Sequence, residues 1–254
     1  MNARNILVPI AAIVVFGILW ELLVWANDWP NYVMASPSDL PPAYARYWDL
    51  FIVMGWQTLW RTVVGLVLAV VFGVLLGMVM GFSRLMRDAL YPLLVGFNAI
   101  PKATLVPIIA LLFVGQHNFN TVMIAFLISF FPIAVSVSIG LSTLEPEYRD
   151  ILRSLGASKT TIFWKIALPK TLPEFFGALK VAVTLAFIGT NLMEIVSPHG
   201  RGLGALFDSG KTNSDYPLMF AVLIALALMG IVLYYVVVAL EKIFAGWAER
   251  SPSY

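Results

Sequence analysis

The chain has no cysteine, only two histidines, and few charged residues for a protein of 254 residues. Without cysteine there are no disulfides, no thiolate catalysis and no cysteine-ligated metal. His117 and His199 are too few to build a multi-histidine metal centre. The net charge of +2 comes from basic residues spread along the chain. No block of like charges suggests a nucleic-acid-binding tail.

The chain is instead rich in apolar residues. They make up 60% of the chain, and charged residues only 12%, whereas soluble domains run at roughly 45–50% and about 25%. A soluble protein of this size leaves much of its surface in water and could not hide this excess. The composition therefore predicts an integral membrane protein with the lipid bilayer as part of its solvent.

Six stretches are apolar and long enough to cross a bilayer, which takes roughly 20 helical residues. The expected fold is all-α, a polytopic membrane protein with one transmembrane domain over residues 1–254. The first stretch is longer than the apolar region of a usual signal peptide and contains Glu21, so we expect it to remain as a helix. The expected spans cover residues 6–26, 59–82, 89–115, 119–144, 172–196 and 217–244.

The distribution of Lys and Arg predicts that both termini are cytoplasmic, because basic residues concentrate in cytoplasmic loops. The outer side then receives only Arg46, Arg61, Arg201 and Lys211. The inner side receives Arg4, Arg84, Arg87, Arg149, Arg153, Lys159, Lys165, Lys170, Lys242 and Arg250. Residues 27–57 are expected to form an outer-surface loop with at most one interfacial helix.

Small residues and prolines mark positions where helices pack closely or break. Gly73, Gly77 and Gly81 recur every four residues and form a ridge without side chains, which predicts close approach of another helix. Prolines interrupt the third and fourth expected spans, and such breaks either border a transport pathway or kink the helix. These prolines are Pro101, Pro107 and Pro132.

The cytoplasmic segment of residues 145–170 has the pattern of a short helical hairpin. One helical face is apolar and is formed by Tyr148, Ile151, Leu152 and Leu155. Gly156 suits the end of a first helix, Ser158 can cap a second one, and Pro169 is expected to end it. The hairpin is too short to fold alone, so either the membrane surface or a cytosolic partner must cover its apolar face.

This segment resembles the EAA motif of binding-protein-dependent ABC importer permeases. The motif is carried by Asp150-Ile151-Leu152, then Gly156 and, after nine more residues, Ile166-Ala167-Leu168-Pro169. The chain is similar over almost its whole length, in particular to the nitrate/sulfonate/taurine branch. The pieces that carry this further likeness are residues 154–158, Ile100-Pro101-Lys102, residues 113–115 and residues 201–204. The family's usual Ala-Ala pair is Ile151-Leu152 here, which affects how closely a partner fits.

The resemblance implies a type I ABC importer fold, with the hairpin forming coupling helices docked on a cytosolic ATPase subunit. It also implies a second permease copy in a homodimer, an extracytoplasmic solute-binding protein, and a location in a bacterial inner membrane. The chain itself is then not an enzyme and holds no cofactor, because ATP and Mg²⁺ belong to the partner subunit. The expected cargo is a small organic or inorganic anion. The coupling residues implied are Asp150, Ile151, Leu152, Arg153, Leu155, Gly156, Ala157, Ser158, Ile166, Leu168 and Pro169.

Ionisable and amide side chains inside the spans are candidates for a translocation pathway or gate. The candidates are Asn98, Lys102, Thr104, Asn191 and Glu194. Lys102 follows a helix break, and its charge would favour an anionic solute, although a structural or gating role is an equal alternative.

Other polar residues have plainer interpretations. Glu21 and Lys180 are expected to reach the headgroup regions, and His117 to lie in a solvated outer turn. Hydroxyls of Ser129, Ser136 and Thr184 are expected to bond to their own helices. Residues 205–212 match a relaxed phosphate-loop pattern, but no strand precedes them, so we expect no nucleotide site there.

Two other functional classes compete with the importer. A secondary transporter or channel would work without an ATPase and often shows internal repeats, of which we find none between the two three-helix halves. An intramembrane enzyme needs clustered His, Asp, Glu or Ser at matched depth. The two histidines fall in expected loops, and no paired acids lie within the spans.

Overall fold

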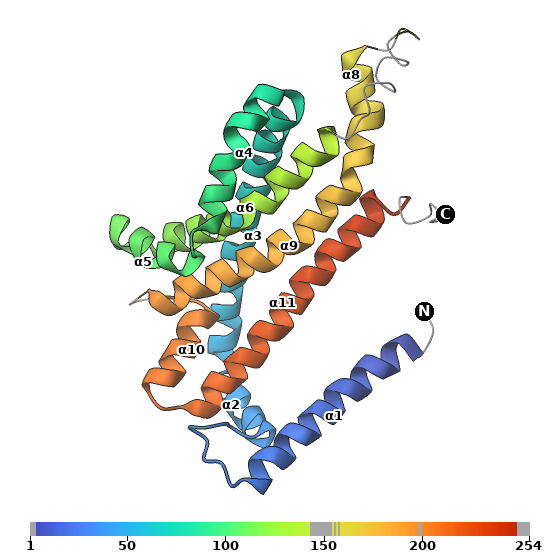
Figure 1. Ribbon diagram of the computed structural model, residues 1–254. Coiled ribbons are helices and arrows are strands. Elements are labelled where there is room, and N and C mark those ends of the chain that lie inside the picture. The colour runs from blue at the N-terminus through green and yellow to red at the C-terminus, as the bar shows by residue number, and fades with distance from the viewer. Residues whose placement is uncertain (1–3, 143–153, 155, 157, 198–199, 248–254) are drawn as a thin grey trace.

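The computed structural model describes residues 4–142, 154, 156, 158–197 and 200–247, and within these ranges it contains helices and no strands (Figure 1). The elements are α1 (Arg4–Ala26), a 3₁₀ turn (Pro37–Asp39), α2 (Leu40–Arg46), α3 (Trp48–Phe82), α4 (Arg84–Ala99), α5 (Lys102–Leu112), α6 (His117–Ser142), α8 (Lys159–Ile162), a π-helical turn (Phe163–Ala167), α9 (Leu168–Val196), α10 (Leu203–Thr212) and α11 (Tyr216–Phe244). The all-α membrane fold expected from the sequence is confirmed.

In the described part of the chain, four helices are long and apolar enough to cross a membrane, namely Trp48–Phe82, His117–Ser142, Trp164–Val196 and Tyr216–Phe244. The pair α4 and α5 qualifies as a fifth span if the two helices are counted as one. In α1, the apolar stretch Ala11–Ala26 is shorter than these spans. Figure 1 shows α1 standing apart from the other helices along most of its length. The described helices therefore provide four spans, or five with the broken pair, and α1 counts only as a shorter apolar helix where the sequence predicts the first of six spans.

The expected third span, residues 89–115, is not one helix. It consists of α4 and α5, which meet at an angle of 89°. Ile100, between them, is extended, with φ −64° and ψ 128°. The residue before a proline avoids the helical region, and Pro101 has no amide hydrogen to donate, so the helix stops here. Pro92, Pro107 and Pro132 lie inside α4, α5 and α6 without ending them.

The centre of the bundle is the contact of α3 with α6 and of α6 with α9. The predicted glycine ridge on α3 is confirmed as the contact with α6. A Cβ at Gly77 would lie only 2.7 Å from the Ala134 carbonyl oxygen. One at Gly73 would lie 2.9 Å from the Ile133 Cβ atom. The two backbones therefore approach more closely than any side chain would permit.

The connections before α3 and before α11 are more helical than the sequence indicated. Residues 27–57 hold α2 and the first turns of α3, and residues 197–216 hold α10. The Tyr47 hydroxyl donates to the Asp215 carboxylate at 2.7 Å, and this bond raises the pKa of Tyr47. The Tyr44 hydroxyl donates to the Ala221 carbonyl, also at 2.7 Å. These two bonds tie α2 and the start of α3 to α11.

We expect Gly77→Ala to destabilise the protein by about 1–3 kcal/mol, because the added methyl group overpacks the α3–α6 contact. Gly177→Ala is the matched control, since a Cβ at Gly177 meets no atom within 4 Å. In a helix interior that change should stabilise by about 0.5–1 kcal/mol. Thermal unfolding of the purified protein in detergent measures both. Equal unfolding temperatures for the two variants would contradict the close contact.

Candidate functional site

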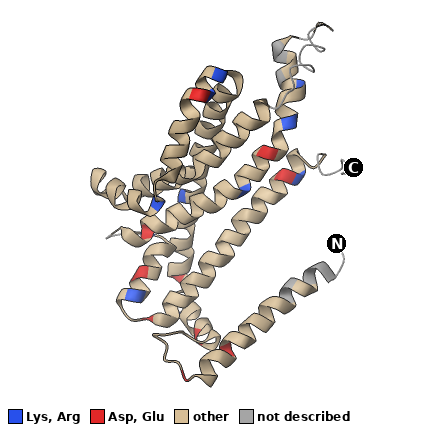
Figure 2. Ribbon diagram, viewed as in Figure 1, with Lys and Arg blue, Asp and Glu red and all other residues tan. Residues whose placement is uncertain are grey.

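The candidate pathway residues fall into two separate places on the structure. Asn98 and Lys102 lie at the break between α4 and α5, and both line a central cavity. Asn191 and Glu194 lie near the C-terminal end of α9. Few charged side chains occupy the spans between these places, as Figure 2 shows by the long tan stretches of ribbon.

The central cavity has a volume of about 760 Å³ and lies between the helix break, α6 and α9. Its walls are mostly apolar, with one lysine and one carboxylate among the lining residues. They are Asn98, Ala99, Ile100, Pro101, Lys102, Ile128, Phe131, Pro132, Val135, Ser136, Ile139, Glu174, Val181 and Leu185. A cavity of this size and lining suits a small organic molecule.

Lys102 also holds the helix break together. Its Nζ donates to the carbonyl oxygen of Asn98 at 2.5 Å and to that of Ile100 at 3.3 Å. Both carbonyls lack helical partners because α4 ends there. Thr104 caps the next turn through a 2.6 Å bond from its hydroxyl to the Pro101 carbonyl and does not line the cavity. Lys102 thus has both of the roles considered from sequence, a structural bond and a charge at a cavity wall.

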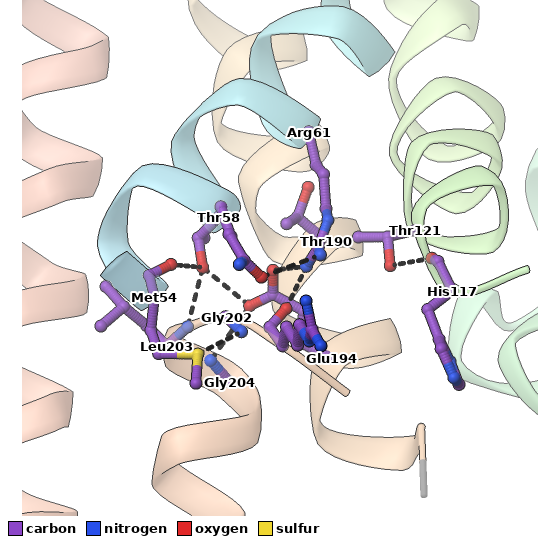
Figure 3. A network of polar contacts seen from close by, with 12 residues as sticks. Met54, Thr58, Arg61, His117, Thr121, Thr190, Glu194, Gly202, Leu203 and Gly204 are labelled. Carbon is purple, nitrogen blue, oxygen red and sulfur yellow. Dashed lines mark hydrogen bonds and ion pairs between the residues drawn. The ribbon is translucent and has the colours of Figure 1, made fainter. Parts of the chain in front are cut away.

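The second place is a buried ion pair. Arg61 of α3 and Glu194 of α9 are joined at 3.1 Å, with only 3% and 1% of their side chains exposed. The Thr58 hydroxyl donates to the same carboxylate at 2.8 Å, and the Gly204 amide does so at 3.0 Å (Figure 3). Asn118 accepts two further bonds from the guanidinium, at 2.7 and 3.0 Å. A buried ion pair persists only when its remaining donors and lone pairs are satisfied, as they are here.

This pair fastens the loop that precedes α10. Arg61 donates to the Arg201 carbonyl, and the Leu203 amide donates to Thr58 at 2.8 Å. Gly202 has a φ of +138°, and a Cβ there would overlap the Glu194 carboxylate. Glycine is therefore required for the loop to approach the acid. The carboxylate also lies at the N-terminus of α10, where a helix dipole favours negative charge.

The sequence missed the partner of Glu194. Arg61 was assigned to the outer side, yet it lies within α3 and is only 2% exposed. A basic residue inside an apolar run is itself a signal of a buried partner. The expected span began only two residues earlier, at residue 59, which made Arg61 resemble a boundary residue. Asn191 does not join the pair, because its amide donates to the Phe187 carbonyl of its own helix at 2.7 Å.

The candidate coupling segment is described only in part. Asp150, Ile151, Leu152, Arg153, Leu155 and Ala157 lie outside the described residues. Gly156 has a φ of +84°, the left-handed conformation expected at a helix end. The Ser158 hydroxyl accepts from the Thr161 amide at 3.1 Å, which is the predicted cap.

Pro169 does not end the second element of the hairpin. The chain is helical from α8 through the π turn into α9, and Pro169 lies in the first turn of α9. Proline has no amide hydrogen to donate. It is tolerated where the π turn gives way to the α-helix, because the regular series of backbone hydrogen bonds is interrupted at that point. Ile166 and Leu168 belong to the same continuous run of residues 159–196. The hairpin's second arm and the fifth expected span are thus one helical rod.

Several polar residues have other partners than the sequence indicated. The Lys180 ammonium binds Glu241 of α11 at 2.8 Å, a partner that the sequence did not indicate. The Ser136 hydroxyl donates to the Glu174 carbonyl of α9 at 2.7 Å, whereas Ser129 and Thr184 bond to their own helices as expected.

Glu21 and His117, which the sequence analysis placed at the headgroups and in a solvated turn, also have polar partners within the chain. Glu21 accepts from both the amide and the hydroxyl of Ser38, and His117 begins α6 with its Nδ1 atom 2.7 Å from the Ser197 hydroxyl. Residues 205–212, which match a relaxed phosphate-loop pattern, are part of α10. Among the described residues, no group of three His, Asp or Glu could hold a metal ion.

Known proteins agree with this architecture. A family model described as "Binding-protein-dependent transport system inner membrane component" matches residues 69–249. The riboflavin transport system permease protein RibX of Chloroflexus aurantiacus is 33% identical over 91% of this chain and 86% of its own length. The formylaminopyrimidine transport permease protein ThiX of Halalkalibacterium halodurans is 35% identical over 64% of each chain.

A solved structure of the MetNI methionine ABC transporter in an inward-facing conformation shares the fold. Its TM-score is 0.65 at 20% identity, over 78% of this chain and 96% of that one. The family model covers most of the chain, including the lining of the central cavity, Glu194 of the buried ion pair and the described part of the hairpin, whereas Arg61 lies before its first matched residue. The chain therefore belongs to the binding-protein-dependent transport system inner membrane components, the permease subunits of ABC importers.

Proposed function

We propose that this permease forms half of a solute pathway and receives its driving force through the helical rod of residues 159–196. The observation that carries the proposal is the continuity of that rod. It begins beside Gly156 in the candidate coupling segment, lines the central cavity through Val181 and Leu185, and ends at the Arg61–Glu194 pair. A displacement at its first turn is thereby transmitted to the cavity wall.

The partners proposed are a cytosolic ATPase that binds ATP and Mg²⁺, a second copy of this chain, and an extracytoplasmic solute-binding protein. Membership in the family supports the first and third. We further propose that both termini and the hairpin face the cytoplasm of a bacterial cell, with the inner membrane around the spans, as the loop charges favour.

The cargo proposed is a small organic anion or an inorganic one. Relatives are named for riboflavin, formylaminopyrimidine and nitrate transport, so the family carries solutes of different chemistry. In this chain, Lys102 places a positive charge at the cavity wall, and Phe131 with its apolar neighbours suits a ring. These features support an organic solute with an anionic group over a bare inorganic ion.

We expect Gly156→Val to abolish co-purification of the ATPase while the permease still inserts into the membrane. A β-branched residue is strongly disfavoured at a φ of +84°, so the hairpin would be distorted. A Cβ at this position meets no atom within 4 Å, so the cause would be the backbone and not crowding.

Gly156→Asn is the matched control, because asparagine tolerates the left-handed conformation. This variant should retain the ATPase in a pull-down with a tagged permease. Full assembly of the valine variant would count against the coupling role of the segment.

We expect Lys102→Gln to lower uptake of an anionic solute by roughly tenfold, because a unit charge at the cavity wall is worth on the order of 1 kcal/mol or more. Glutamine can still donate to the Asn98 and Ile100 carbonyls, so the helix break should persist. Lys102→Arg keeps the charge and should keep most of the uptake. The measurement is solute uptake into proteoliposomes that contain the assembled transporter. Unchanged uptake by the glutamine variant would refute the proposed attraction of an anion.

A further inference from the structure

In Figure 1 the start of α4 lies at the same end of the bundle as α8. A further cavity, with an arginine and an aspartate in its lining, lies here between α4 and α6. Its volume is about 430 Å³. It is bordered by α4 and α6 and shares only Ile139 with the central cavity. The lining residues are Arg87, Asp88, Tyr91, Pro92, Ser138, Ile139 and Ser142.

Ser138 is a mostly buried residue, only 3% exposed, that lines this cavity. Its hydroxyl makes no hydrogen bond with another described residue. The hydroxyls of the other buried serines and threonines are all bonded within the described chain, namely those of Thr58, Thr62, Thr121, Ser129, Thr171 and Thr190. The Ser138 hydroxyl is therefore available to a polar group that enters the cavity from outside the chain.

Arg87 is fixed at the wall of the cavity with donors to spare. Its Nε donates to the Met80 carbonyl at 3.2 Å, and its Nη2 donates to the Gly81 carbonyl at 3.3 Å. Both acceptors belong to the last turn of α3, which a cation stabilises. A guanidinium has five N–H groups. The Nη1 hydrogens and one on Nη2 therefore have no acceptor within the described ranges.

Asp88 adds a negative charge to the same cavity, and Tyr91 adds a phenol. Neither side chain makes a hydrogen bond or ion pair with another described residue. A bare anion would be repelled by Asp88, and a bare cation by Arg87. The combination instead fits a zwitterion, with an anionic oxygen group at Arg87 and Ser138 and an ammonium group at Asp88.

The cavity lies at a membrane boundary. The span α3 ends at Phe82, and charged residues begin with Arg84. Apolar side chains nevertheless remain exposed along α4, with Leu85 at 72% and Leu93 at 68%. This pattern, charges beside exposed apolar groups, is typical of the headgroup region of a bilayer.

We propose that this cavity binds the headgroup of a phosphatidylethanolamine lipid. Its phosphate oxygens accept from the free guanidinium hydrogens of Arg87 and from the Ser138 hydroxyl, and its ammonium group donates to Asp88. The acyl chains lie against the apolar residues of α4. The lipid then bridges α4 and α6 beside the central cavity, so membrane composition affects how firmly the two helices are joined.

The test uses the assembled transporter in nanodiscs that contain equal amounts of phosphatidylethanolamine and phosphatidylcholine. After extraction in mild detergent, quantitative mass spectrometry measures which lipid remains bound. Wild-type transporter should retain phosphatidylethanolamine in preference, because the trimethylated ammonium of phosphatidylcholine cannot donate to Asp88. Asp88→Asn should reduce this preference roughly tenfold, the value of one charge-assisted hydrogen bond. Ser138→Ala should weaken retention of both lipids.

Arg84→Gln is the matched control, because Arg84 lies in the same turn of α4 but does not line the cavity. This variant should retain as much of each lipid as the wild-type transporter does. Neither Asp88 nor Ser138 bonds to α3, so their variants should unfold at the wild-type temperature. An unchanged lipid preference in Asp88→Asn would overturn the proposal. The proposal would also be overturned if glycerophosphoethanolamine displaced the bound lipid at the same concentration as intact lipid does. A soluble zwitterion would then be the ligand.

Discussion

The close packing of α3 against α6, and of α6 against α9, is the constraint on which the rest of this permease depends. In a bilayer, helices are not driven together by the hydrophobic effect, so their association relies on backbone proximity and on polar contacts between them. The glycine ridge of α3 supplies the first, and the Arg61–Glu194 pair supplies the second. The central cavity is formed by α6, α9 and the break between α4 and α5. The buried network is formed by α3, α6, α9 and the start of α10.

The end of α9 and its middle have different environments. At one end of the helix, Glu194 is enclosed by donors and holds the loop before α10 at fixed distance from α3. Along its middle, the same helix forms an open wall of the central cavity. Lys180 binds Glu241 and joins α9 to α11. The helix α9 is therefore held to α3 and α10 near one end and to α11 along its length.

The sequence predicted the membrane class, the family and most spans, because these depend on local composition and on length. The position of the glycine ridge was also predictable, since a four-residue repeat is visible without knowledge of the partner helix. The break at Pro101 was recognised only as an interruption. Whether a proline kinks a helix or ends it depends on what satisfies the freed carbonyls, and here Lys102 does so from the next helix.

The pairing of distant side chains was not predictable. Arg61 and Glu194 are 133 residues apart, and Lys180 and Glu241 are 61 apart. The sequence alone places Arg61 on the outer side, Glu194 at a gate and Lys180 at the headgroups, because a single sequence gives no information on which helices are neighbours. The same limit applied to Ser136, which bonds across to α9, and to Pro169, where a π turn carries the helix past the proline.

The account requires the segment around Gly156 to face the cytoplasm, where an ATPase could bind it. The chain contains no cysteine, so Ser158→Cys introduces a single thiol beside this segment, and Lys211→Cys introduces one on the exposed end of α10. The measurement is labelling with a membrane-impermeant maleimide in intact cells and in inverted membrane vesicles. The account predicts that the thiol at position 158 reacts only in inverted vesicles and is protected when the ATPase is bound, while that at 211 reacts only in intact cells. Labelling of position 158 from outside the cell would contradict it.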